Sequence, residues 1–319
     1  MIASTPQTGE TPAGVGIPVP REDFHPGRDY FAARRSPFGQ SSIDLVIGPL
    51  RMRIDGLSEP QAIGLEARFS PFVSVPDGRP DLTIGLRRAA VGGFLKLPAP
   101  GMLETYRLES RPEAGRVAIW SYEFAGWVEP GQGRAELDLA AAEGALFDRG
   151  LENFLRVMTA SFILRQGGLL LHAAGVVRGG RAHIFFGPSG AGKTTVTRLS
   201  PRDVVLSDDL TLIVPGTDGA GPQAVGIPFG MAHHHVPDTN GSFPIATLNR
   251  LVQSPLVRRT EIPYSQAVAE VASSLPFVMQ ETGQAMLAME IAAAILRDVP
   301  VHRLEFRRDD SFWSVVEEG

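Results

Sequence analysis

The sequence of 319 residues predicts an α/β (α+β) fold, in which a small β-rich domain precedes a domain of mixed sheet and helices. First, a glycine-rich loop at residues 187–194 joins an apolar β-like run to a helical one. Second, the pair Gly179-Gly180 separates two β-like runs before this loop, so we expect them to be antiparallel neighbours. Third, short β-like runs between glycine and proline turns fill residues 41–139.

The loop reads GPSGAGKT and matches the G-x-x-x-x-G-K-T pattern of phosphate-binding loops. Its glycines let backbone N–H groups turn toward a phosphate, Lys193 brings positive charge to the β- and γ-phosphates of ATP, and Thr194 offers a hydroxyl to Mg²⁺. A chance match in a glycine-rich turn is the alternative. The flanking strand 182–186 and the helix start 195–199 favour nucleotide binding. The predicted nucleotide-binding residues are Gly187, Pro188, Ser189, Gly190, Ala191, Gly192, Lys193, Thr194 and Thr195.

The chain divides into four predicted segments. These are a mobile tail rich in Pro, Gly, Ser and Thr (1–40), a β-rich N-terminal domain (41–140), a bridging helix (141–167) and a P-loop nucleotide-binding domain (168–319). Strands of the β-rich domain are expected at 43–47, 51–54, 82–86, 105–108, 117–122 and 127–129. This domain either presents a substrate or packs on the nucleotide domain.

The C-terminal half alternates between β-like and helical patterns. Strands are expected at 169–177, 182–186, 204–209, 225–231, 244–252 and 301–306, with 210–214 continuing or pairing with the strand before it. One or two helices are expected in residues 264–297, with Pro276 as a break, and a short helix at 310–316 closes the chain.

The pair Asp208-Asp209 follows the apolar strand that begins at Val204. Chemistry on a Mg²⁺-nucleotide needs a carboxylate besides the loop, either to hold the metal or to accept a proton. If the strand continues through the pair, consecutive side chains face opposite sides, and only one carboxylate points at the phosphates. A pair that merely caps a turn is the alternative. We expect Asp208, with Thr194, at the metal.

His172 lies fifteen residues before the loop, in an apolar run paired with the strand that enters it. A histidine in such a run is either a core residue or a group that exchanges protons in the site. Its proximity in sequence to the loop and to the Asp pair makes it a candidate catalytic residue.

Three stretches, LLLHAAGVV, GPSGAGKTT and LSDD, occur in this order within residues 169–209. Together they resemble the C-terminal catalytic domain of the HPr serine kinase/phosphorylase family, over roughly residues 168–230. The resemblance implies a phosphoenolpyruvate-carboxykinase-like P-loop fold, ATP and Mg²⁺ as cofactors, and phosphoryl transfer to a serine hydroxyl. It also implies three catalytic residues: His172, Lys193, and Asp209 as the base.

The chain departs from that family's pattern. Residues 224–230 contain no glutamate where the family has a metal ligand, and only Arg258 or Arg259 could supply the family's later arginine. The N-terminal half does not resemble that of the bifunctional enzymes. We therefore expect a stand-alone HPr-kinase-like serine kinase that acts on a peptide or protein. A nucleotide-binding regulator without transfer activity and a kinase acting on a small-molecule hydroxyl are the alternatives.

The composition predicts few other partners. The net charge is −5 and there is no cysteine, so we expect no nucleic acid partner, disulfide or thiolate metal site. No run is long and apolar enough for a membrane span, and the N-terminus does not resemble a signal peptide, so a cytoplasmic protein with no membrane partner is expected. A homo-oligomer is possible, since members of the resembled family form oligomers. We interpret His233-His234-His235 as a surface or substrate-loop segment, rather than a metal site.

Overall fold

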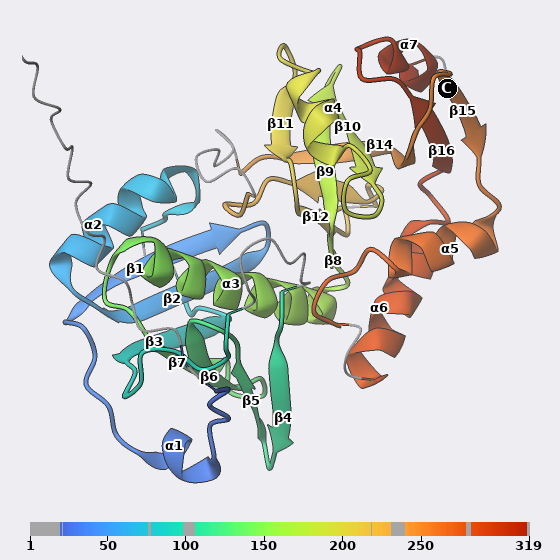
Figure 1. Ribbon diagram of the computed structural model, residues 1–319. Helices are drawn as coiled ribbons and strands as arrows, with labels where there is room; N and C mark the ends of the chain where they lie inside the picture. Colours follow the sequence, from blue (N-terminus) through green and yellow to red (C-terminus); the bar gives the residue numbers. More distant parts are fainter. Residues whose placement is uncertain are drawn as a thin grey trace, which may run out of the picture.

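A computed structural model describes residues 20, 22–75, 78–97, 106–217, 219–230, 240–278 and 282–317. This part of the chain has a mixed α/β fold with two mixed β-sheets, as the sequence predicts at this level (Figure 1). Residues 1–19 and 21 of the predicted N-terminal tail and the run His233–His235 lie outside the described residues. Among the described helices, none has the length and apolar character that crossing a membrane requires.

The first sheet has seven strands in the order β1-β2-β3-β7-β6-β5-β4. Strands β2, β3 and β7 run parallel to one another, and the remaining neighbours are antiparallel. In β1 every second residue, Ile43, Leu45 and Ile47, is buried, as expected for a strand with one face on a core. The strands are β1 (Ser41–Ile47), β2 (Leu50–Leu57), β3 (Leu82–Arg88), β4 (Glu109–Glu113), β5 (Arg116–Trp120), β6 (Phe124–Glu129) and β7 (Arg134–Leu139).

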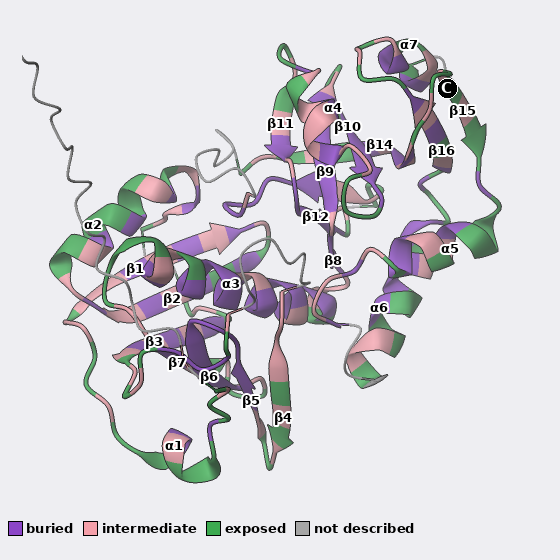
Figure 2. Cartoon of the chain, viewed as in Figure 1, coloured by how far each residue is buried: buried purple, intermediate pink, exposed green. Residues whose placement is uncertain are grey.

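Helices α2 (Glu59–Arg68) and α3 (Gly144–Ile163) pack on the first sheet. Helix α2 was not predicted, although Ser58 and Gln61 form a capping box at its start. The helix predicted within 141–167 is present as α3, although it begins at Gly144 and ends at Ile163. Figure 1 shows α3 lying between the first sheet and β8, and Figure 2 shows that much of its length is buried. The short helices α1 (Arg28–Ala32), η1 (Ser70–Phe72) and η2 (Leu164–Gln166) complete this half.

The second sheet has nine strands. Seven follow the order β11-β9-β10-β14-β13-β12-β8, and β16 extends the sheet beside β14, with β15 beyond it. The strands are β8 (Leu169–Leu171), β9 (Ala173–Arg178), β10 (Arg181–Phe186), β11 (Val204–Ser207), β12 (Thr211–Val214), β13 (Gln223–Val225), β14 (Ser242–Gln253), β15 (Arg258–Glu261) and β16 (Val301–Phe306). The predicted antiparallel hairpin before the phosphate loop is confirmed, because β9 pairs with β10 in that sense.

Two predictions about these strands are wrong. The run 169–177 is not one strand: it breaks at His172 into β8, which pairs with β12, and β9, which pairs with β10 and β11. The run 210–214 neither continues β11 nor pairs with it, because β12 pairs with β8 and β13. Periodicity could not reveal either break, since the residues on both sides of each one are equally apolar.

Both breaks occur where the chain passes between two portions of the second sheet. One portion contains β11, β9 and β10, and the other contains β13, β12 and β8. The twelve-residue strand β14 joins them, because it pairs with β13 at one end and with β10 further along. The chain crosses between the portions once at His172 and again at Asp208-Asp209. The crossings therefore bring the candidate catalytic residues together.

Helices cover the remaining sides of this sheet. Of the one or two helices predicted in 264–297, two are present, α5 (Tyr264–Ala272) and α6 (Thr282–Ile295), with Pro276 between them. The helices α4 (Lys193–Arg198) and α7 (Phe312–Glu317) pack around an aromatic core in which Phe185 contacts Phe312 and Trp313. Strands β4, β7 and β15 were not predicted. The strand expected at 105–108 is absent from its described residues 106–108, and the one expected at 225–231 is β13, which ends at Val225.

The buried His183 of β10 predicts an acid sensitivity of the fold. Burial and the cations Arg259, Arg181 and Arg178 lower the pKa of His183 from 6.5 to about 4. The unfolded chain therefore binds a proton between these values that the folded chain does not, so stability falls as the pH drops below 6.5. His183→Phe retains the edge contact with Trp313 and cannot titrate. Between pH 7 and pH 5 the wild type should lose about 2 kcal/mol more free energy of unfolding than this variant. Urea titrations at both pH values measure the difference, and equal losses would contradict this role of His183.

Candidate functional site

The phosphate-binding loop runs from the end of β10 into the start of α4. Gly187 is buried, whereas Pro188, Ser189 and Gly190 are exposed. Three glycines have positive φ angles: 151° at Gly187, 78° at Gly190 and 112° at Gly192. Such backbone angles favour glycine, because a Cβ atom would clash with the neighbouring carbonyl. The sequence pattern thus matches the conformation that the loop adopts.

Lys193 is folded back into the loop. Its Nζ donates to the carbonyl oxygen of Gly187 at 3.0 Å and to that of Pro188 at 3.4 Å. Burial lowers the pKa of Lys193 below its usual value, and the Asp209 carboxylate opposes this effect. The ammonium group therefore already lies within the loop, close to a carboxylate. Thr194 and Thr195 follow it on the first turn of α4.

His172 and Asp209 form a close pair at the two chain crossings. The His172 Nε2 atom lies 2.9 Å from Asp209 Oδ1. The His172 side chain is 40% exposed, whereas that of Asp209 is only 8% exposed. In this pair the imidazole is thus the more accessible group, and the carboxylate lies behind it.

Ser207 shapes the turn that carries Asp209. Its hydroxyl oxygen accepts hydrogen bonds from the backbone N–H groups of Asp209 at 3.2 Å and of Leu210 at 3.0 Å. Strand β11 ends at Ser207, so Asp208 and Asp209 lie in a bend, and the alternation expected of strand residues does not apply. Asp209 is buried and Asp208 is half-buried.

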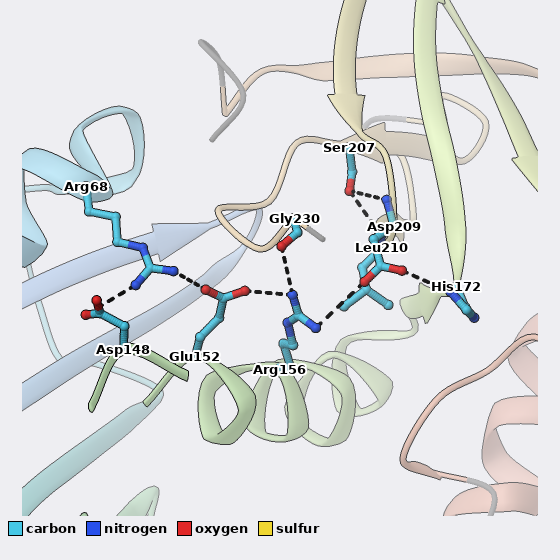
Figure 3. Close-up of polar contacts among 9 residues, drawn as sticks. All are labelled: Arg68, Asp148, Glu152, Arg156, His172, Ser207, Asp209, Leu210 and Gly230. Carbon is cyan, nitrogen blue, oxygen red and sulfur yellow. Dashed lines mark hydrogen bonds and ion pairs between the residues drawn. The ribbon is translucent and has the colours of Figure 1, made fainter. Parts of the chain in front are cut away.

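The structure adds Arg156, which the sequence patterns did not single out. This residue of α3 places Nη1 3.7 Å from Asp209 Oδ2, and its Nη2 donates to Glu152 Oε1 at 2.6 Å. Glu152 also pairs with Arg68 of α2, as Figure 3 shows. A sequence signal existed: Glu152 and Arg156 are four residues apart, within the apolar pattern used to predict the helix.

A cavity of about 180 Å³ opens between the loop and α5. It is lined by His172, Gly187, Pro188, Arg250, Glu270, Ser273 and Ser274. Arg250 of β14 pairs in register with Phe186, the residue before the loop, and its Nε donates to Glu270 Oε2 at 3.1 Å. Arg250 was not predicted as a site residue, because only the sheet pairing brings it beside the loop.

The two arginines suggested by the sequence are engaged elsewhere. Arg258 pairs with Glu305, and Arg259 donates to Thr247 and to the carbonyl oxygen of Val316. Burial lowers the pKa of Arg259 from its usual value. Arg258 thus contacts β16, Arg259 contacts β14 and α7, and neither arginine is among the residues that line the cavity.

The residues at the loop fit a nucleotide phosphate better than a protein-made metal site. The loop has an inward ammonium group, positive-φ glycines and open space around the position that a Cβ of Gly190 would take. Within the described ranges, no group of three or more His, Asp or Glu side chains is placed to hold a metal ion. A magnesium ion at Thr194 and Asp208 would therefore take most of its ligands from phosphate and water.

The family model described as "SynChlorMet cassette protein ScmC" matches residues 153–318, just over half of the chain. This is a different family from HPr serine kinase/phosphorylase, so the membership suggested by the three sequence stretches is wrong. Short patterns of this kind, a phosphate loop above all, occur in many different families and do not by themselves identify one. No significant match to a curated protein was found.

The loop geometry predicts different tolerances at two of its glycines. A Cβ on Gly192 would lie 2.6 Å from Cζ of the buried Phe306, whereas a Cβ on Gly190 would meet no atom within 4 Å. Both have positive φ, so Gly190→Ala should cost about 1 kcal/mol through backbone strain alone. Gly192→Ala should cost about 3 kcal/mol, because overpacking adds to the strain. Chemical denaturation of both variants measures this, and equal losses of stability would contradict the close packing of Gly192 against Phe306.

Proposed function

This chain belongs to the SynChlorMet cassette protein ScmC family, and we propose that it is an ATP- and Mg²⁺-dependent kinase that phosphorylates a hydroxyl group. One observation carries the proposal: the loop with its inward Lys193 follows the end of β10 and lies beside the close pair His172–Asp209. A phosphate-binding loop next to a proton-accepting pair and an open cavity is what phosphoryl transfer to a hydroxyl requires.

The finer fold that we propose for residues 168–319 is a phosphoenolpyruvate-carboxykinase-like P-loop domain. The antiparallel β9–β10 hairpin that leads into the loop supports it, since a simple β-α-β nucleotide fold would have parallel strands there. The mixed pairing of the sheet around β14 also supports it, because β14 is parallel to β10 and antiparallel to β13.

In this proposal, residues 187–195 hold the nucleotide phosphates. Lys193 would exchange its carbonyl partners at Gly187 and Pro188 for phosphate oxygens, which are stronger acceptors because they are charged. Thr194 and Asp208 would contact the magnesium ion. When bound, Mg²⁺-ATP supplies the γ-phosphoryl group. The bond between this group and ADP breaks as the group forms a bond to the acceptor oxygen.

The pair His172–Asp209 would take the proton that the acceptor hydroxyl loses. His172 lines the cavity and is the more exposed member, so it is placed to meet the hydroxyl, with the buried Asp209 directly behind it. This division of roles differs from the expectation that Asp209 meets the acceptor alone. When His172 takes the proton, the Asp209 carboxylate stabilises the resulting positive charge on the imidazole.

The acceptor that we propose is a serine hydroxyl of a peptide or protein. A cavity of about 150 Å³ holds one small ring, so the cavity of about 180 Å³ beside the loop is large enough for one side chain. A small molecule with a hydroxyl group is the competing acceptor class, and a phosphate-transfer screen against both classes separates them.

Nucleotide binding is tested with the only two lysines of the chain, Lys193 and Lys96. Mg²⁺-ATP at one hundred times its dissociation constant should stabilise the wild type by about 2.7 kcal/mol, because the ligand binds only the folded state. Lys193→Ala should lose most of this stabilisation, and Lys96→Ala should keep it. A thermal-shift titration measures it, and an equal response in both variants would contradict the role of Lys193.

The proton-accepting pair is tested with Asp209→Asn. This variant should bind ATP but lose about 10²–10⁴-fold in turnover, the usual contribution of a positioned base. Asp203→Asn is a matched control, since Asp203 pairs with Arg178 away from the loop. Transfer of radiolabelled γ-phosphate is the measurement, and unchanged turnover in Asp209→Asn would rule out this function for Asp209.

The cavity is tested with Arg250→Met. Loss of the guanidinium beside the loop should lower turnover by about 10²-fold, because arginine stabilises charge on a transferring phosphoryl group. Arg258→Met is the control. It removes an arginine of β15 that pairs with Glu305 of β16, and it should change turnover less than about twofold. Equal effects of the two substitutions would show that the cavity is not where transfer occurs.

A nucleotide-binding regulator without transfer activity is the second candidate function. The contacts of Asp209 favour this function. One carboxylate oxygen pairs with His172 and the other lies near Arg156, so both oxygens already have a partner and neither is free to meet an acceptor hydroxyl. Such a protein would bind ATP and return it unchanged. Chromatography of the nucleotide recovered from the protein distinguishes the two functions, since a kinase given its acceptor would yield ADP.

A further inference from the structure

We propose that Arg156 is a positioning residue that orients Asp209, and that Arg68 of the N-terminal half secures Arg156 through Glu152. The inference rests on the proposed function of the His172–Asp209 pair and deepens it. It also gives the first sheet and its helices a role: they supply a side chain on which the geometry of the site depends.

The side chains form a row of alternating charge, drawn in Figure 3. In spatial order the row contains Asp148, Arg68, Glu152, Arg156, Asp209 and His172. Arg68 belongs to α2, whereas Asp148, Glu152 and Arg156 belong to α3. Asp209 and His172 lie at the two chain crossings of the second sheet. The row therefore runs from helices on the first sheet to the candidate site.

Arg156 is held at three points. Its Nη2 donates to Glu152 Oε1 at 2.6 Å and to the carbonyl oxygen of Gly230 at 3.2 Å, and its Nη1 lies 3.7 Å from Asp209 Oδ2. The side chain is only 14% exposed. A planar guanidinium fixed at several points sets the direction of each N–H, so it can fix the carboxylate next to it as well.

Asp209 needs such a partner because a carboxylate can rotate about its bond to Cβ. With Oδ1 beside His172 and Oδ2 facing Arg156, the two contacts define one rotamer. Without the guanidinium, the carboxylate would still lie near two other groups that can carry positive charge, Lys193 in the loop and His172 when protonated. We expect the carboxylate then to turn toward Lys193 and to lengthen its contact with His172.

Glu152 needs Arg68 for the corresponding reason. The Glu152 carboxylate is 11% exposed and lies between two guanidinium groups, with Oε2 paired to Arg68 and Oε1 to Arg156. Removing one cation beside this buried carboxylate leaves part of its charge uncompensated, and the neighbouring side chains rearrange to solvate it. The family match begins at residue 153, so Arg156 lies inside the matched segment, whereas Arg68 and Glu152 lie outside it.

The loss of a purely structural salt bridge would also destabilise the folded protein, so a stability measurement alone cannot test the proposal. The His172 ring nitrogens provide a direct readout, because ¹⁵N chemical shifts of imidazole depend on the hydrogen bond made by each nitrogen. The experiment uses the full chain labelled with ¹⁵N-histidine, without nucleotide, and assigns the His172 signals by their loss in His172→Gln.

Arg156→Met is the test variant, and Arg149→Met is its matched control. Arg149 also lies on α3 and also pairs with a buried carboxylate, but that carboxylate belongs to Glu123, which is not a member of the row. We expect Arg156→Met to shift the His172 Nε2 resonance by several ppm, and Arg149→Met to leave it unchanged. Arg68→Met should shift it in the same direction by a smaller amount, and it provides the test if Arg156→Met does not fold.

A His172 resonance that stays unchanged in both Arg156→Met and Arg68→Met would overturn the proposal. An equal shift in Arg149→Met would also overturn it, since the effect would then come from general destabilisation. This readout needs no enzymatic activity, so it is independent of whether the chain transfers phosphate. If transfer is detected, Arg156→Met should lower kcat at least tenfold while the midpoint of the ATP titration changes less than threefold.

Discussion

The candidate site depends on one buried carboxylate. Asp209 lies in the bend after β11, with its backbone N–H bound to the Ser207 hydroxyl and its two oxygens next to His172 and Arg156. A carboxylate with so little exposure needs opposite charges or hydrogen-bond donors around it, because little water reaches it to stabilise its negative charge. The surrounding elements, namely α3, the two chain crossings and the loop, are arranged so that each provides one of these partners.

This constraint explains why the two sheets are not independent. Helix α3 packs on the first sheet with its apolar side and contacts β8 of the second, and it also delivers Arg156 to Asp209. The aromatic core of Phe185, Phe312 and Trp313 supports β10, so the loop that follows starts from a fixed strand end. The position of Lys193 relative to Asp209 thus follows from packing on two different sides of the second sheet.

Membership in the ScmC family and the resemblance to another family depend on different lengths of sequence. The resemblance rested on a histidine, a phosphate-loop pattern and an Asp pair in a short segment, and such short patterns recur in different families. The family match covers residues 153–318, which include helices α5 and α6 and the strands after the loop. These local patterns predict a nucleotide site, but they could not identify the family.

The sequence by itself determined the elements whose signals are local, and only the tertiary structure decided which residues surround them. The local elements include the glycine pattern of the loop, the β9–β10 hairpin, the amphipathic helix α3 and the break between α5 and α6. Each depends on neighbouring residues only, through allowed φ angles, turn chemistry or a period of 3.6. By contrast, the breaks at His172 and at Asp208-Asp209 arise from strand pairing across two portions of one sheet, which no short window of sequence records. Arg156 and Arg250 reach the site only because α3 and β14 pack beside it. The physical reason is that a buried charge selects its partners by proximity in space, and proximity between distant segments is set by how the hydrophobic faces assemble.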